Sequence, residues 1–147
     1  MIKYSFKVYS INIIMEKRIN KELDDLTNEG YETHIHKDKN NKTILTTDTF
    51  KLELPINYPF TAPYIYIALN NGKYATISQM ECLLLNKKIF DTFKKEDMDK
   101  LQFINSEIKD ILGIHYSPSI PLTSYVKHLD FLSKTFYNYD KEIRYTY

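Results

Sequence analysis

A stretch with three prolines constrains the fold of this chain more than any other part of its sequence. It covers residues 50–67 and reads FKLELPINYPFTAPYIYI. Residues 50–54 alternate between apolar and charged side chains, which is typical of a half-buried strand, and β-branched and aromatic residues after Pro63 predict a second strand. Proline fixes φ and lacks a backbone donor, so the corner between these strands is neither a helix nor a ladder. We expect Tyr58 and Phe60 to bury apolar surface and make the corner rigid.

A long amphipathic helix is predicted before this pair of strands. Apolar residues recur every three or four positions over residues 11–28, and Gly30 is placed to end the helix. Residues 1–10 alternate weakly and are expected to form an extra strand or an ordered arm. Strand patterns over residues 31–37 and 42–48 precede the two strands of the corner, so we expect a four-stranded antiparallel meander.

The second half of the chain is predicted to be mostly helical. Residues 73–81 show no clear period and are expected to form an irregular connection. Apolar spacing predicts a helical insertion over residues 87–112 and a helix with a broad apolar face over residues 123–136. Residues 137–147 form a polar, tyrosine-rich tail. We therefore expect an α+β protein with one domain over residues 11–136.

Composition excludes several classes of protein. The 147 residues are enough for one domain with a real core. Twenty Lys and Arg against nineteen Asp and Glu do not favour a nucleic-acid partner. No apolar run approaches the length of a membrane span, and the first residues lack the pattern of a signal peptide. The single cysteine, Cys82, excludes an intrachain disulfide, so we expect an intracellular protein, cytoplasmic or nuclear, with no membrane partner.

Three motifs, in the same order along the chain, resemble those of the ubiquitin-conjugating enzyme family. Residues 17–26, KRINKELDDL, are similar to the K-R-L/I-x-K-E-L-x-x-L pattern of the family's first helix. The proline-rich corner resembles the family's segment that ends in Y-P-F-x-x-P, with Ala62 where the first of two prolines usually stands. A later Y-S-P resembles the W-S-P that leads into the family's central helix. The residues that carry the second and third motifs are Tyr58, Pro59, Phe60, Pro63, Tyr116, Ser117 and Pro118.

The resemblance implies a UBC-like fold. Its parts are an N-terminal helix, a four-stranded antiparallel meander, the Tyr-Pro-Phe corner and a central helix. Residues 87–112 would be an insertion, and the family's two C-terminal helices have no room after residue 136. The family's G-P-x-x-x-x-Y-x-G-G loop is replaced by a tight turn at residues 46–49.

The resemblance also implies thioester chemistry on Cys82. Family members carry ubiquitin or a ubiquitin-like modifier on a cysteine and transfer it to an amine, with an activating enzyme and a ligase as partners. This requires an accessible thiolate and a donor that stabilises the oxyanion. Cys82 stands about as far beyond the corner as the family's nucleophile does. The donor Asn of the family's H-P-N tripeptide is absent, and only a shifted loop would bring Asn70 or Asn71 into its place. No cofactor or metal is implied.

A binding module is the alternative interpretation. Ubiquitin-conjugating-enzyme variants resemble this chain in lacking the two C-terminal helices, and often lack the nucleophile. RWD-type interaction domains share the first helix, the meander and the Tyr-Pro corner, whereas Tyr116-Ser117-Pro118 favours the conjugating family. A module of this kind would bind ubiquitin or an active conjugating enzyme through the meander and the first helix. Cys82 would then be a buried or dispensable thiol.

The four histidines do not support a competing site. His34 and His36 lie two apart on a predicted strand, but no third ligand stands nearby, so we predict no metal site. His115 and His128 would be the bases of a protease-like site with Cys82. A cysteine and scattered histidines are weak evidence for such a site.

Overall fold

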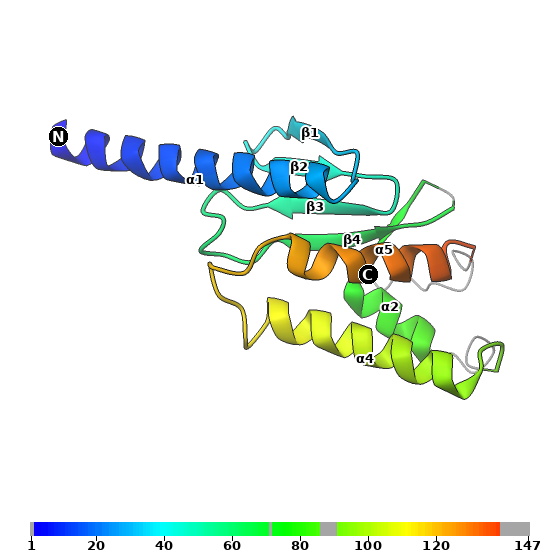
Figure 1. Cartoon of the computed structure of the whole chain (residues 1–147). Coiled ribbons are helices and arrows are strands. Elements are labelled where there is room, and N and C mark those ends of the chain that lie inside the picture. Colours follow the sequence, from blue (N-terminus) through cyan, green and yellow to red (C-terminus); the bar gives the residue numbers. More distant parts are fainter. Residues whose placement is uncertain (1, 71, 86–90, 139–147) are drawn as a thin grey trace.

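Figure 1 shows a computed structural model of the chain, which describes residues 2–70, 72–85 and 91–138, without the side chains of residues 2–14, 83 and 84. The protein is α+β, and its five strands form one antiparallel sheet in the order β1-β2-β3-β4-β5. Four helices accompany the sheet in this part of the chain. In chain order the elements are α1 (Ile2–Asn28), β1 (His34–Lys37), β2 (Thr43–Thr46), β3 (Phe50–Leu54), β4 (Tyr64–Ala68), β5 (Tyr74–Ala75), α2 (Ile77–Leu84), α4 (Lys95–Leu112) and α5 (Thr123–Phe136).

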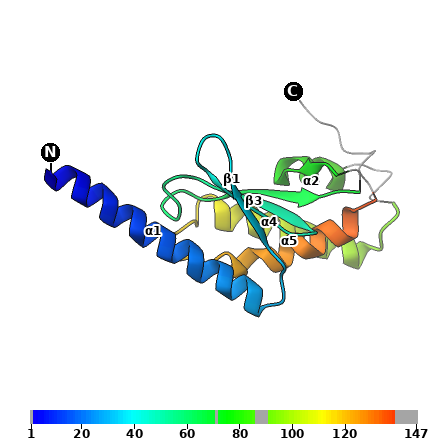
Figure 2. The same ribbon diagram turned by 90° about the horizontal axis from the view of Figure 1, so that it is seen from above.

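Helix α1 is longer than its apolar pattern predicts. The helix over residues 11–28 is confirmed, but it begins at Ile2, so the extra strand expected within residues 1–10 is wrong. Those residues contain neither glycine nor proline, so they include no residue that would break a helix. Gly30 ends the helix as expected, since it adopts a φ of +94° and its N–H bonds to the Thr27 carbonyl. Figure 2 shows that the N-terminal half of α1 extends beyond the sheet.

Side chains alternate between the two faces of the sheet. In β3 the burial pattern repeats every second residue, and Leu52 lies opposite Ile65 of β4. Helices α1 and α5 lie on the face that carries these two residues (Figures 1 and 2). The largest fully buried side chains are Leu26, Leu45, Phe50, Leu52, Leu54, Tyr58, Ile67, Met80, Tyr125 and Phe136.

Polar contacts fix α5 against the sheet. The Thr49 hydroxyl donates to the Asp130 carboxylate at 2.8 Å, just before β3 begins. The buried Ser133 hydroxyl donates to the carbonyl of Ala68 at the same distance, at the end of β4. The predicted helix over residues 123–136 therefore packs across the centre of the meander, which is confirmed by its fully buried Val126 and Leu129.

The proline-rich corner joins β3 to β4, and only one of its two aromatic residues is buried. Tyr58 is 1% exposed and is followed by a cis peptide bond to Pro59. Phe60 is 64% exposed, so the expectation that it buries apolar surface is wrong. The Phe60 N–H bonds to the Asn57 carbonyl in a tight turn, and this turn directs the two aromatic residues differently.

The segment after β4 is more ordered than its sequence suggests. Residues 73–81 were expected to be irregular, but they contain β5 and the start of α2. The Thr76 hydroxyl accepts the Gln79 N–H, and the Gln79 side chain accepts the Thr76 N–H, a reciprocal cap that starts α2. Within the predicted insertion, a turn over residues 91–94 leads into α4, which ends at Leu112, while residues 87–90 lie outside the described residues.

Candidate functional site

A buried carboxylate joins the first helix to the proline-rich corner. Glu22 of α1 is 3% exposed, and its Oε2 accepts the Tyr58 hydroxyl and, at 3.1 Å, the Leu122 N–H. Burial and the hydrogen bond to Glu22 raise the pKa of Tyr58 well above its usual value. A carboxylate that accepts two buried donors contributes to stability, because losing it would leave both donors unpaired.

Two further side chains, Arg18 and Tyr116, extend this network to the segment before α5. Arg18 forms an ion pair with Glu22 at 3.4 Å and donates to the Ile120 carbonyl at 3.1 Å. The Tyr116 hydroxyl donates to the Pro59 carbonyl. The three motifs that resemble the conjugating family therefore meet around Glu22, where they hold the fold together. Of the other motif residues, Pro63 is buried, Ser117 is half-buried and Pro118 is exposed.

Cys82 is exposed and lies in the second half of α2. The preceding residue, Glu81, pairs with Lys109 of α4 at 2.6 Å. An exposed thiol meets one requirement of thioester chemistry. Its other requirement is a donor for the oxyanion.

Of the two asparagines predicted as possible oxyanion donors, only Asn70 lies within the described residues. Asn70 is exposed, and its N–H donates to the carbonyl of Tyr137 just beyond α5. This bond holds Asn70 at the end of β4, before β5 and α2 begin. Asn71 lies outside the described residues. The role of Cys82 as a nucleophile stays a prediction.

The histidines have partners of other kinds. His115 lies 2.8 Å from the Asp110 carboxylate, and His128 lies 3.6 Å from that of Glu107. Both carboxylates belong to α4, and neither histidine contacts Cys82. His34 and His36 are exposed on β1, and no group of three metal ligands is found in the described part of the chain. The same residues contain no helix long and apolar enough to cross a bilayer.

The face of the sheet opposite α1 and α5 carries aromatic and charged side chains. We call this surface the open face, because no helix covers it over β1 to β3 in the described part of the chain (Figure 2). On β3, β4 and β5 its side chains include Lys51, Glu53, Tyr64, Tyr66 and Tyr74.

Lys51 organises the open face. Its Nζ lies 4.4 Å from the ring centre of Tyr66 and 4.6 Å from that of Tyr74. The same Nζ lies 3.6 Å from Glu53. Burial and the Glu53 carboxylate raise the pKa of Tyr66. Tyr64 remains 54% exposed at the edge of this cluster. Tyrosines held by such contacts are preordered, and aromatic residues of this kind often dominate protein–protein interfaces.

The sequence analysis did not identify the open face as a site. The signal is the alternation of Tyr64 and Tyr66 with Ile65 and Ile67, which places two tyrosines on one face of β4. The pairing of Lys51 with Tyr66 depends on the register of β3 against β4, and one strand pattern does not specify that register.

The comparisons with known proteins give no family to which the chain can be assigned. No family model, no curated protein and no solved structure matches it.

Proposed function

We propose that this protein is a binding module related to the conjugating-enzyme variants or RWD-type domains, and that its open face binds ubiquitin or an active conjugating enzyme. The observation that carries this proposal is the cluster of three tyrosines on the face of the sheet opposite α1 and α5, two of which contact Lys51. A preordered aromatic surface loses little side-chain entropy when a partner covers it.

The surroundings of Cys82 support binding over catalysis. The oxyanion donor that the family supplies has no counterpart at the matching position of the sequence, where Lys73-Tyr74-Ala75 stands. Removing a single oxyanion donor costs about 3 kcal/mol of barrier, roughly a hundredfold or more in rate. The absence of this donor does not affect the open face, and the proposal depends on the open face alone.

A titration followed by NMR tests the proposal. The ¹⁵N-labelled chain is titrated with ubiquitin and, separately, with an active conjugating enzyme. We expect saturable shifts centred on Lys51, Tyr64, Tyr66 and Tyr74 with at least one of the two proteins. Tyr64→Ala should weaken this binding. Phe103→Ala is the control, because Phe103 is an exposed aromatic residue of α4, away from the open face, and it should leave binding unchanged. Saturable binding that avoids the open face, or no binding to either protein, would overturn the proposal.

A second candidate function is thioester transfer, which the exposure of Cys82 favours. In this function the Cys82 thiolate attacks the ubiquitin thioester carried by the activating enzyme, forms a new thioester and releases the thiol of that enzyme. An amine of the target then attacks the new thioester, forms an amide and releases the Cys82 thiol. The chain is incubated with activating enzyme, ATP and ubiquitin, beside Cys82→Ala and Cys82→Ser, and run on a non-reducing gel. A reducible adduct that Cys82→Ala loses and Cys82→Ser converts to a stable ester would establish the enzyme. Our proposal predicts no adduct.

A further inference from the structure

Strand β4 has a free edge beside an apolar recess. β5 pairs with β4 only at Ile67 and Ala68, and the chain then turns into α2 at Ile77. The first three residues of β4 therefore have β3 on one side and no strand of the described residues on the other. Because β4 is otherwise an inner strand of the sheet, this edge is a gap in the ladder.

The hydrogen-bond register shows which backbone groups face the gap. The Ala68 N–H bonds to the Thr49 carbonyl, so Ala68, Tyr66 and Tyr64 direct their backbone groups toward β3. In an antiparallel ladder these directions alternate, and the N–H and C=O of Ile65 therefore face away from β3. No strand of the described chain pairs with them.

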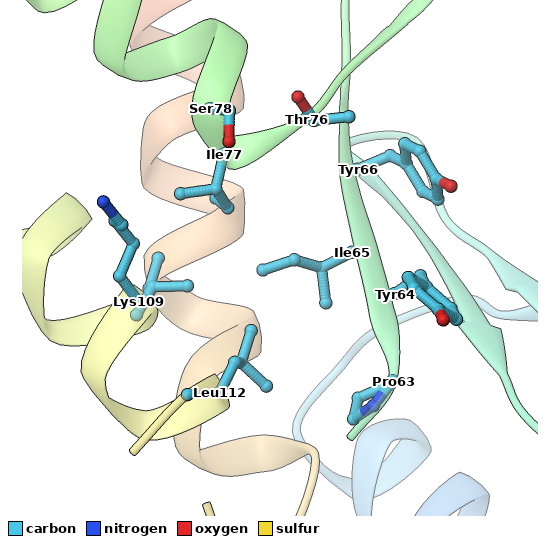
Figure 3. Close-up of a pocket in the computed structure, with 11 residues that line it drawn as sticks. Pro63, Tyr64, Ile65, Tyr66, Thr76, Ile77, Ser78, Lys109 and Leu112 are labelled. Carbon is cyan, nitrogen blue, oxygen red and sulfur yellow. The ribbon is translucent and has the colours of Figure 1, made fainter. Parts of the chain in front are cut away.

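The gap opens on a recess of about 280 Å³ between β4, the start of α2 and the end of α4. Its apolar lining includes Ile65, Ile77, Ile108 and Leu112. Figure 3 shows the Ile65 side chain directed toward Ile77 and Leu112, on the opposite side of β4 from the two tyrosines. The only charged side chain of the lining is Lys109, and it is paired with Glu81.

We propose that this edge is a second docking site, which binds an extended peptide segment of a partner protein by strand addition to β4. The backbone of the segment pairs with the N–H and C=O of Ile65, and an apolar side chain enters the recess. The next side chains of the segment lie on the open face, beside Tyr64 and Tyr66, because successive side chains of a strand alternate. The lining is apolar, and its Lys109 is already paired with Glu81, so we expect the bound segment to be uncharged.

The free protein gives a first test that needs no ligand. Amide hydrogen exchange is measured by NMR on the full chain. The Ile65 N–H should exchange at least about tenfold faster than those of Tyr64 and Tyr66, which bond to β3. Equal protection of the three amides would mean that the edge is already paired, and it would overturn the proposal.

Peptide selection gives the second test. A phage-displayed library of random linear peptides is selected on the immobilised full chain. We expect the enriched sequences to alternate apolar and polar residues and to lose binding about tenfold or more on Leu112→Lys, which fills the recess. Phe103→Lys, a change of the same kind on the exposed face of α4, should retain binding. No enrichment, or equal binding to both variants, would overturn the proposal.

A selected peptide then reports on the pairing itself. It should slow exchange of the Ile65 amide, and N-methylation at alternate residues of the peptide should abolish binding while the intervening positions tolerate it. This pattern does not depend on the folding of any protein variant. It also separates the two sites, because shifts confined to Lys51 and Tyr74 without protection of Ile65 would support the open face and contradict strand addition.

Discussion

Ile65 and Tyr66 are neighbours in β4, but they lie on opposite faces of the sheet and in different surroundings. Ile65 is 8% exposed and lies opposite Leu52 on the face that α5 covers. Tyr66 lies opposite Lys51 on the open face, where a cation and a second tyrosine hold it. One face is made of apolar side chains packed against helices, whereas the other carries a cluster of charged and aromatic side chains. Substitutions on the two faces should therefore separate folding stability from binding.

The largest loss of stability is expected on the covered face. Leu52→Ala removes a fully buried side chain and should lower the free energy of unfolding by about 2–5 kcal/mol, since it loses apolar burial and leaves a cavity. Urea denaturation followed by circular dichroism measures the change. A loss below about 1 kcal/mol would show that this face is not packed as described.

The next largest effect is expected from the buried carboxylate that joins α1 to the corner. Glu22→Ala leaves the Tyr58 hydroxyl and the Leu122 N–H without their acceptor, and should cost about 2–3 kcal/mol. Glu16→Ala is the matched control, because Glu16 is an exposed acid of the same helix, and it should change stability by about 0.5 kcal/mol or less. Equal effects in the two variants would contradict the network.

A pH dependence is expected from the same network. The pKa of Tyr58 is raised in the folded state, so above its ordinary value the unfolded chain binds fewer protons than the folded chain. Its stabilising contribution is therefore complete below about pH 10 and is lost as the pH rises, by about 1.4 kcal/mol per pH unit for this group. The free energy of unfolding of Tyr58→Phe should therefore fall less steeply with rising pH than that of the wild type. Identical slopes for the wild type and this variant would contradict the assignment.

The smallest effect on stability is expected on the open face. Lys51→Ala removes two cation–π contacts and one partly exposed ion pair, and should cost about 1 kcal/mol or less. Urea denaturation is again the measurement. A loss as large as that of Leu52→Ala would mean that Lys51 supports the fold, and the contrast between the two faces would fail.

Much of the meander could be predicted from the sequence, because its signals are local. The alternation over β3, the rigid corner after Leu54 and the apolar stripe of α1 each follow from neighbouring residues. The missed elements had weaker signals. β5 has only two residues, too few to show a period, and the start of α2 was placed in an irregular connection because its reciprocal cap was not recognised.

The candidate site could be predicted only in part, because it depends on pairing between strands. The resemblance to the conjugating family nominated Cys82, whose exposure the sequence does not specify. The residues around Glu22 were recognised as motifs, but their meeting point required the packing of α1 against the corner. The open face and the free edge at Ile65 both follow from register, which only the folded sheet defines.

The most direct test of the proposed function compares two single variants in one binding measurement. The affinity of the full chain for the protein that binds it in the NMR titration is measured by calorimetry for the wild type, Tyr66→Ala and Cys82→Ala. We predict that Tyr66→Ala weakens binding about tenfold or more, as expected for an aromatic residue at the centre of an interface, while Cys82→Ala binds like the wild type. Wild-type affinity in Tyr66→Ala together with a loss in Cys82→Ala would contradict the proposal that the open face is the functional surface.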